Sequence, residues 1–129
     1  MNDGMLMLEN VTVQAGNFIL SPFSLDIGEG ECVALMGPSG CGKTTLLETI
    51  CGLRDGPVGG RIVLGGMEVT NLSPGARGIG LVPQDIALFP SLTVREQIEF
   101  GPKLHGWEPE EVKERVESLA GDLGLTKLL

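Results

Sequence analysis

The residues of this chain best suited to chemistry form one short run, GPSGCGKT, at positions 37–44. The run follows the pattern G-x-x-x-x-G-K-[ST], the Walker A motif, in which the backbone N–H groups of a glycine-rich loop surround a phosphate. Lys43 is expected to reach the β- and γ-phosphates of a nucleotide, and the Thr44 hydroxyl to ligate Mg²⁺. The glycines are expected to take positive φ and to let the backbone approach the phosphate without a Cβ in the way. The residues expected to bind the phosphates are Gly37, Pro38, Ser39, Gly40, Cys41, Gly42, Lys43, Thr44 and Thr45.

The segments on either side of this loop supply the structural context that the motif needs. Residues 32–36, CVALM, have the length and apolar content of a short buried strand. Residues 45–51 have helical spacing of apolar side chains, and Gly52 follows where a helix would stop. A glycine-rich turn with an incidental lysine is the simpler alternative. The order of strand, loop and helix argues against it.

Composition limits the kinds of protein that this chain can be. The 129 residues are enough for one modest domain, and the formal net charge of −8 with only 9 lysines and arginines argues against a broad nucleic-acid-binding surface. No apolar run approaches the roughly 18 residues of a membrane span, and no basic cluster at the start suggests a secretory signal. The three cysteines show no C-x-x-C spacing, so we expect reduced thiols, with Cys32 and Cys51 as small core residues.

The β-strand signals lie on both sides of the loop. Alternating apolar residues predict strands at 5–13 and 18–27, joined by a tight turn. A two-residue glycine turn predicts a hairpin over 61–69. Residues 72–77 are interpreted as a surface turn, followed by a second short buried strand at 79–82.

The sequence pattern of the last third of the chain predicts two helices. Thr93 and Glu96 form a capping box for a helix that runs through Phe100. His105, the only histidine, is interpreted as a surface residue between the helices. The final helix opens around Pro109, with acidic residues in its first turn. Its apolar face, expected to pack in the core, consists of Val112, Val116, Leu119 and Leu123.

Three stretches together resemble the ATP-binding subunit of an ATP-binding-cassette (ABC) transporter. They are GPSGCGKTT at 37–45, GRIVLGGMEV at 60–69 and GLVPQDIALFPSLTVREQIEFG at 80–101. Many NTPases share the first, whereas VPQ followed by LFP and LTV in the third is far more specific. The resemblance covers the chain from about Leu8 to its end. Within the family, the sequence is most similar to bacterial importers of molybdate, polyamine or ferric iron. It implies an α/β protein with the P-loop NTPase fold of ABC ATPase type, in which an N-terminal antiparallel β subdomain joins a partial RecA-like core.

The resemblance also implies roles for particular regions of a partial ATP-binding domain at 1–129. The Walker A motif spans 37–45, the Q-loop region 82–94, and a helical subdomain starts at about 93–129. Gln84 corresponds to the Q-loop glutamine, which senses the γ-phosphate and, together with Thr44, the Mg²⁺ that accompanies ATP. The surface at 85–93 corresponds to the place where a membrane-spanning permease subunit docks. A cytoplasmic location at the inner face of the membrane is implied too.

An aromatic side chain next to the nucleotide can stack on its base. The family usually carries a tyrosine just before the position of Gly16, where this chain has Ala15. Phe18 is the obvious substitute for stacking on adenine. An ordinary core residue of a strand is an equally good interpretation of Phe18.

Three family motifs do not occur in this sequence: the L-S-G-G-Q signature, the Walker B strand ending in Asp-Glu, and the switch histidine. The first would complete the site of a second ATP-binding subunit in a head-to-tail dimer, and the others hold Mg²⁺ and the attacking water. We therefore expect a truncated chain, assign no catalytic residue and leave open whether it is an enzyme. The alternatives are a non-catalytic nucleotide-binding fragment and a non-transport ABC ATPase. The latter is disfavoured because the stretch between Lys43 and Gln84 is too short for a coiled-coil or DNA-binding insert.

Overall fold

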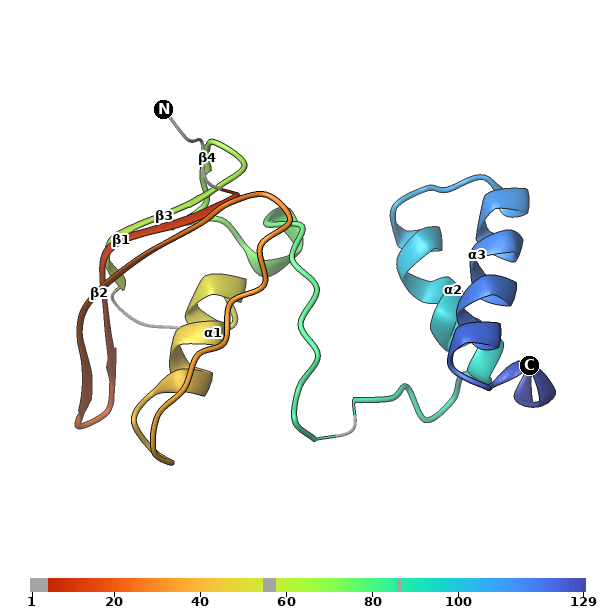
Figure 1. Cartoon of the computed structure of the whole chain (residues 1–129), viewed down its shortest axis with the longest axis horizontal. Coiled ribbons are helices and arrows are strands. Elements are labelled where there is room, and N and C mark those ends of the chain that lie inside the picture. Colours follow the sequence, from red (N-terminus) through yellow and green to blue (C-terminus); the bar gives the residue numbers. More distant parts are fainter. Residues whose placement is uncertain (1–4, 55–57, 86) are drawn as a thin grey trace. The chain divides into compact units, whose positions relative to one another are not determined.

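The computed structural model describes residues 5–54, 58–85 and 87–129, which divide into two compact units, one up to Val82 and one from Pro83 onward. The first unit is built on a four-stranded antiparallel sheet with the strand order β2-β1-β3-β4 (Figure 1). Both predicted hairpins are confirmed, and β1 joins them at the centre of the sheet. The strands are β1 (Leu6–Ala15), β2 (Phe18–Ile27), β3 (Val58–Leu64) and β4 (Met67–Glu68).

Helix α1 (Lys43–Cys51) packs against this sheet (Figure 1). Its buried side chains Leu46 and Ile50 lie one turn apart, which places them on the same side of the helix. The helix ends at Gly52, whose φ of 74° is the left-handed conformation of a C-terminal cap. The buried core of the unit consists of Leu8, Val11, Val13, Leu46, Ile50, Ile62 and Val69.

Two predicted strands, 32–36 and 79–82, do not form in the structure. Both segments lie outside regular secondary structure, and neither pairs with a strand among the residues that the structure describes. A buried strand of the parallel kind needs a hydrogen-bonding neighbour on its edges, which the antiparallel sheet does not supply here. Leu35 and Ile79 still pack on the core, whereas Met36 is 87% and Val82 93% exposed. Cys32, expected in the core, is exposed for the same reason.

The second unit contains helices α2 (Val94–Leu104) and α3 (Pro109–Asp122) and the short 3-10 helix η2 (Thr126–Leu128). The predicted capping box is confirmed, and α2 extends one turn beyond its predicted end. On α3 the buried residues are Val112, Val116 and Ala120. Leu123, predicted on the same face, is 65% exposed because the helix ends before it.

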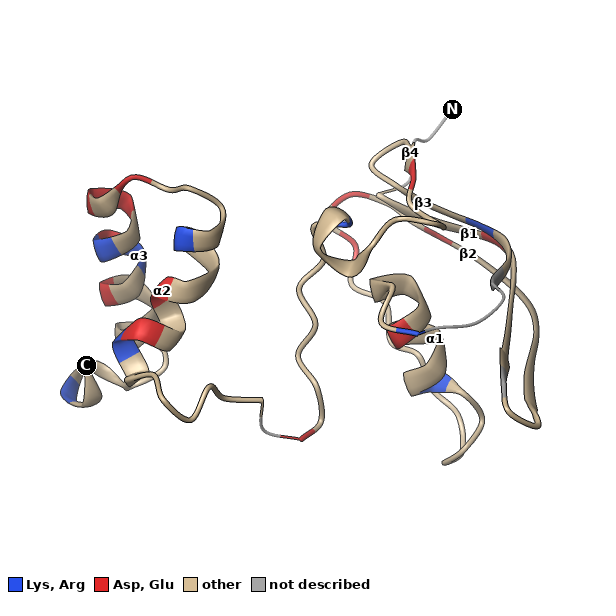
Figure 2. Cartoon of the chain, turned by 180° about the vertical axis from the view of Figure 1, so that it is seen from behind, with Lys and Arg blue, Asp and Glu red and all other residues tan. Residues whose placement is uncertain are grey.

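Charged residues are frequent on α2 and α3. Figure 2 shows acidic and basic residues interspersed on both helices. On α2, Nζ of Lys103 forms an ion pair with Oε2 of Glu99, one turn earlier in the helix, at 2.6 Å. None of the helices in the described part of the chain has the length and apolar character needed to cross a bilayer.

Candidate nucleotide-binding site

The Walker A residues form a loop that leads directly into α1. Gly40 and Gly42 have φ values of 80° and 99°, which side chains rarely tolerate, and Gly42 is the N-cap of the helix. Gly37 differs from our expectation, because its φ is not positive. A Cβ built on Gly37 would lie 2.8 Å from Sγ of Cys41, so a side chain at position 37 would require the Cys41 side chain to move.

The N-terminus of α1 is left open by the protein itself. Among the residues that the structure describes, no side chain caps it, and no acidic residue occupies its first turn. Its first backbone hydrogen bond runs from the N–H of Leu46 to the carbonyl oxygen of Gly42, at 2.9 Å. The N–H groups of the preceding residues, 43–45, therefore have no partner within the helix. Such free N–H groups, together with the positive end of the helix dipole, attract an anion.

The other two α-helices of the described chain are capped by their own side chains. Thr93 and Glu96 cap α2, and Glu108 and Glu111 form the same kind of box on α3. The open start of α1 is thus a local feature of the glycine loop. An anion from outside the chain can occupy the place that a capping side chain takes in α2 and α3.

Lys43 connects the end of the loop to its beginning. Its Nζ donates hydrogen bonds to the carbonyl oxygens of Gly37, at 2.7 Å, and Pro38, at 2.8 Å. A third, longer contact runs from Nζ to Sγ of Cys41 at 3.7 Å, so all three donors of the ammonium group are directed at atoms of the loop. The charge of Lys43 is thereby held at the mouth of the loop, beside the free N–H groups of the first turn.

The structure brings Phe18 together with the loop. A Cβ built on Gly42 would lie 2.7 Å from Cζ of Phe18 and 3.4 Å from Cδ1 of Leu20. The half-buried ring of Phe18 therefore packs against the N-cap of α1. This position suits both interpretations of Phe18, because the same ring can pack on the loop and present an edge or face to a base. Its role in adenine stacking stays a prediction.

Thr44 and Gln84, the predicted Mg²⁺ ligands, lie in different units. The Thr44 side chain is exposed on the first turn of α1. Gln84 is exposed in a bend at the start of the second unit, and its role beside the phosphates stays a prediction. Within the predicted docking surface at 85–93, residue 86 lies outside the described residues.

Arg77 was missed by the sequence analysis, which placed it in a surface turn. It is only 7% exposed and follows the 3-10 helix η1 (Pro74–Ala76). Its guanidinium donates to four backbone carbonyl oxygens at 2.8 to 2.9 Å, two of them, Thr49 and Ile50, at the end of α1. The other two belong to Thr70 and Leu72. Burial lowers the pKa of this guanidinium.

One signal could have found Arg77. A helix that ends at glycine leaves carbonyl oxygens without partners, and arginine is a common partner for them. A Cβ on Gly52 would lie 2.6 Å from Nε of Arg77, so this glycine also makes room for the guanidinium. A glycine at position 52 and an arginine at position 77 therefore depend on each other.

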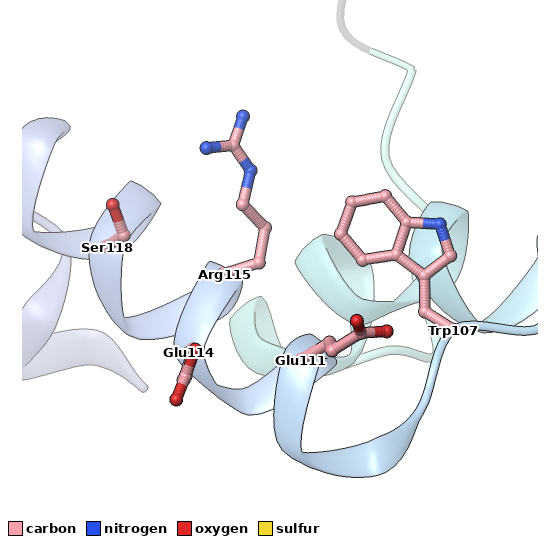
Figure 3. A pocket seen from close by; sticks show the side chains of 5 residues that line it. All are labelled: Trp107, Glu111, Glu114, Arg115 and Ser118. Carbon is pink, nitrogen blue, oxygen red and sulfur yellow. The ribbon is translucent and has the colours of Figure 1, made fainter.

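A hollow of about 580 Å³ lies beside α3, lined by Trp107, Glu111, Glu114, Arg115 and Ser118 (Figure 3). Its polar side chains do not converge: Arg115 and Ser118 extend to one side of the helix and Glu114 to the other. Binding pockets hold a ligand with a few polar groups directed at one place. The hollow is therefore not treated as a binding site.

A profile of the ABC transporter family matches residues 20–129. The chain belongs to the ABC transporter family. The resemblance to ATP-binding subunits of importer type, predicted from the sequence, is thus confirmed, and so is the antiparallel sheet with helices that an ABC ATPase of α/β class contains.

Three import ATP-binding proteins are among the relatives of this chain. The Fe(3+) ions import ATP-binding protein FbpC of Brucella abortus (strain 2308) is 44% identical over 115 residues, covering 88% of this chain and 32% of FbpC. The molybdate/tungstate import ATP-binding protein WtpC of Pyrococcus abyssi is 41% identical over 125 residues, covering 97% and 36%. The maltose/maltodextrin import ATP-binding protein MalK of Yersinia pestis bv. Antiqua is 41% identical over 128 residues, covering 95% and 34%. The chain spans about a third of the length of these curated relatives.

Proposed function

We propose that this chain is the nucleotide-binding part of the energy-coupling ATP-binding subunit of an ABC importer. The observation that carries the proposal is the uncapped start of α1, entered through Gly40 and Gly42 and joined by the ammonium of Lys43. The names of the relatives, all import ATP-binding proteins, support the same function.

In this proposal the loop holds the polyphosphate of ATP. The N–H groups at the start of α1 donate to phosphate oxygens. Lys43 exchanges its long contact with Sγ of Cys41 for the β- and γ-phosphates. The exposed hydroxyl of Thr44 is a hard oxygen ligand of the kind that Mg²⁺ prefers. Mg²⁺ bound with ATP would neutralise part of the phosphate charge. Gln84, a neutral side chain that donates and accepts, would complete the Mg²⁺ shell and sense the γ-phosphate.

Hydrolysis is proposed for the whole protein rather than for these residues alone. The 129 residues contain neither an L-S-G-G-Q sequence nor an apolar strand ending in Asp-Glu. These supply the groups that position Mg²⁺ and the attacking water and that complete the site of a second ATP-binding subunit. We therefore infer binding without sustained turnover by residues 1–129, within a partial RecA-like core. Turnover in a head-to-tail dimer would belong to a longer chain.

The proposed partners are membrane-spanning permease subunits, bound through the surface at 85–93. This assigns the protein to the cytoplasmic face of the membrane. Apolar side chains are exposed in this stretch, including Leu88 and Phe89. Exposed apolar groups on a charged unit are typical of a surface that contacts another protein.

Titration with MgATP tests the nucleotide part of this proposal. Amide signals of residues 37–45 should shift in the wild-type protein, whereas Lys43→Ala should weaken binding by about a hundredfold, because a charge-assisted bond to phosphate is lost. Lys113→Ala, which removes an exposed lysine of α3, is the matched control and should bind like wild type. Unchanged loop amides in a folded wild-type sample would refute nucleotide binding.

A further inference from the structure

The side-chain amide of Gln97 is fastened to the backbone of the segment at 88–92. The N–H of Phe89 donates to Oε1 of Gln97 at 3.0 Å. Nε2 of Gln97 donates to the carbonyl oxygens of Phe89 and Leu92, each at 3.4 Å. One side chain thus uses its acceptor and its donors on both ends of a single turn.

The turn that Gln97 holds is a tight one that precedes α2. The N–H of Leu92 donates to the carbonyl oxygen of Phe89 at 3.1 Å, which closes the turn. Thr93 then caps α2, and the N–H of Gln97 donates to the Thr93 carbonyl oxygen at 3.0 Å. The backbone of Gln97 is thus held in the first turns of α2, and its side chain in turn holds the backbone of residues 89–92.

A second residue of α2 holds the same phenylalanine by its ring. The rings of Phe89 and Phe100 lie 4.7 Å apart at an angle of 40°. Gln97 and Phe100 are three positions apart, which puts them on one face of the helix. Together they fasten the backbone and the ring of Phe89, yet leave its side chain 47% exposed and Leu88 64% exposed.

Only an amide side chain can make this set of contacts. Gln97 presents a carbonyl oxygen to an N–H group and an NH₂ group to carbonyl oxygens. Glutamate could accept from Phe89 but would direct its negative charge at two carbonyl oxygens, and alanine could do neither. The identity of residue 97 therefore determines how firmly the exposed apolar turn is held.

We propose that Gln97 is a positioning residue that presents Leu88 and Phe89 in a fixed shape to the membrane-spanning subunit. The inference rests on the proposed function, because it assigns the occupant of this surface to a permease subunit. A preformed apolar surface binds a partner more tightly than a mobile one, since less conformational freedom is lost on binding.

The test uses the whole gene product with its permease subunits in detergent or lipid nanodiscs. In Gln97→Ala, backbone hydrogen exchange at 88–92 should accelerate, with no change at α1, and affinity for the permease subunits should fall by about tenfold as two or three hydrogen bonds are lost. Gln97→Glu should retain protection of the Phe89 amide but lose affinity. Glu117→Ala, which truncates an exposed side chain of equal length on α3, should match wild type in both measurements.

The outcomes separate this inference from the proposed function. Faster exchange with unchanged permease affinity would show that Gln97 holds the turn but that this is not needed for docking. That result would overturn the inference alone. Unchanged exchange in Gln97→Ala would overturn it as well. Failure of the wild-type protein to bind any permease subunit would overturn the proposed function, and the inference would fall with it.

Discussion

Nη1 of Arg77 lies 2.9 Å from the carbonyl oxygen of Thr49, in the last turn of the helix that begins at the phosphate loop. The same nitrogen lies 2.8 Å from the carbonyl oxygen of Ile50. Helix α1 is thereby fastened at its C-terminus by a buried cation, while its N-terminus is left open for an anion. Both arrangements suit the helix dipole, whose negative end faces Arg77.

Arg77→Ala should lower the free energy of unfolding by about 3 kcal/mol, because carbonyl oxygens in a buried site lose their donors. Chemical denaturation of wild type and variant measures this difference. Arg77→Lys should recover only part of it, since an ammonium cannot reproduce the planar set of donors that contacts four carbonyl oxygens.

Arg54→Ala is the matched control for Arg77. Arg54 also contacts α1, through an ion pair with Glu48 at 2.8 Å, but about a third of each side chain is exposed. Exposed ion pairs contribute about 0 to 1 kcal/mol. Equal losses for the two arginine variants would contradict the role given to burial at Arg77.

Gly42→Ala should weaken MgATP binding by about tenfold or more, because the residue has a φ of 99° and its new Cβ would press on Phe18. The loop must shift to relieve this contact, and the free N–H groups of α1 would move with it. Isothermal titration calorimetry measures the affinity of both proteins.

Gly75→Ala provides the comparison for Gly42. A Cβ on Gly75 has nothing within 4 Å, and its φ is not in the left-handed range. Its MgATP affinity should equal that of wild type. An unaffected Gly42→Ala protein would show that the loop tolerates a side chain at its N-cap.

The local elements of this chain were predictable because their signals are local. The glycine turn at 65–66, the capping residues Thr93 and Glu96, and the Walker A pattern each act over a few neighbouring positions. Their structures depend little on the rest of the chain, so the hairpins, α1 and α2 agree with the sequence.

The incorrect predictions concern features that depend on distant partners. Residues 32–36 and 79–82 are apolar enough for buried strands, but a strand also requires a neighbour, which periodicity alone does not reveal. Arg77 was misplaced because two of its four carbonyl partners lie at the end of α1, more than 25 residues earlier in the sequence, and the other two follow β4. Gln97 was overlooked because a polar residue on a helix normally faces solvent.

The capping box of α2 should make its stability depend on pH in acid. Hydrogen bonds from the backbone and side chain of Thr93 lower the pKa of Glu96 below its usual value of 4.5. A lowered pKa in the folded state means that the ionised Glu96 stabilises the fold above pH 4.5 and that this contribution is lost as the pH falls through the folded-state pKa. The penalty of Glu96→Ala in thermal unfolding should therefore be present at neutral pH and disappear in acid.

Thr93→Ala separates the two halves of the box. It removes the hydroxyl that accepts from the N–H of Glu96 at 3.3 Å, an interaction that does not titrate. The same hydroxyl also contributes to the lowered pKa of Glu96. The cost of Thr93→Ala, about 1 kcal/mol for an N-cap, should therefore fall only in part in acid, whereas that of Glu96→Ala should disappear. A Glu96→Ala penalty that is constant from neutral pH to pH 3 would contradict the assigned pKa direction.

The three thiols should differ in reactivity toward iodoacetamide. Cys32 and Cys41 are exposed, whereas Cys51 is buried, and burial raises the pKa of the Cys51 thiol despite the opposing charge of Arg77. The thiolate is the reactive form, so Cys51 should be modified more than about tenfold more slowly than the others under native conditions. Mass spectrometry of digested protein gives the rate at each site. Arg77→Ala should expose Cys51 to the reagent by loosening the end of α1, and rapid labelling of Cys51 in folded wild-type protein would show that this end of the helix is not closed.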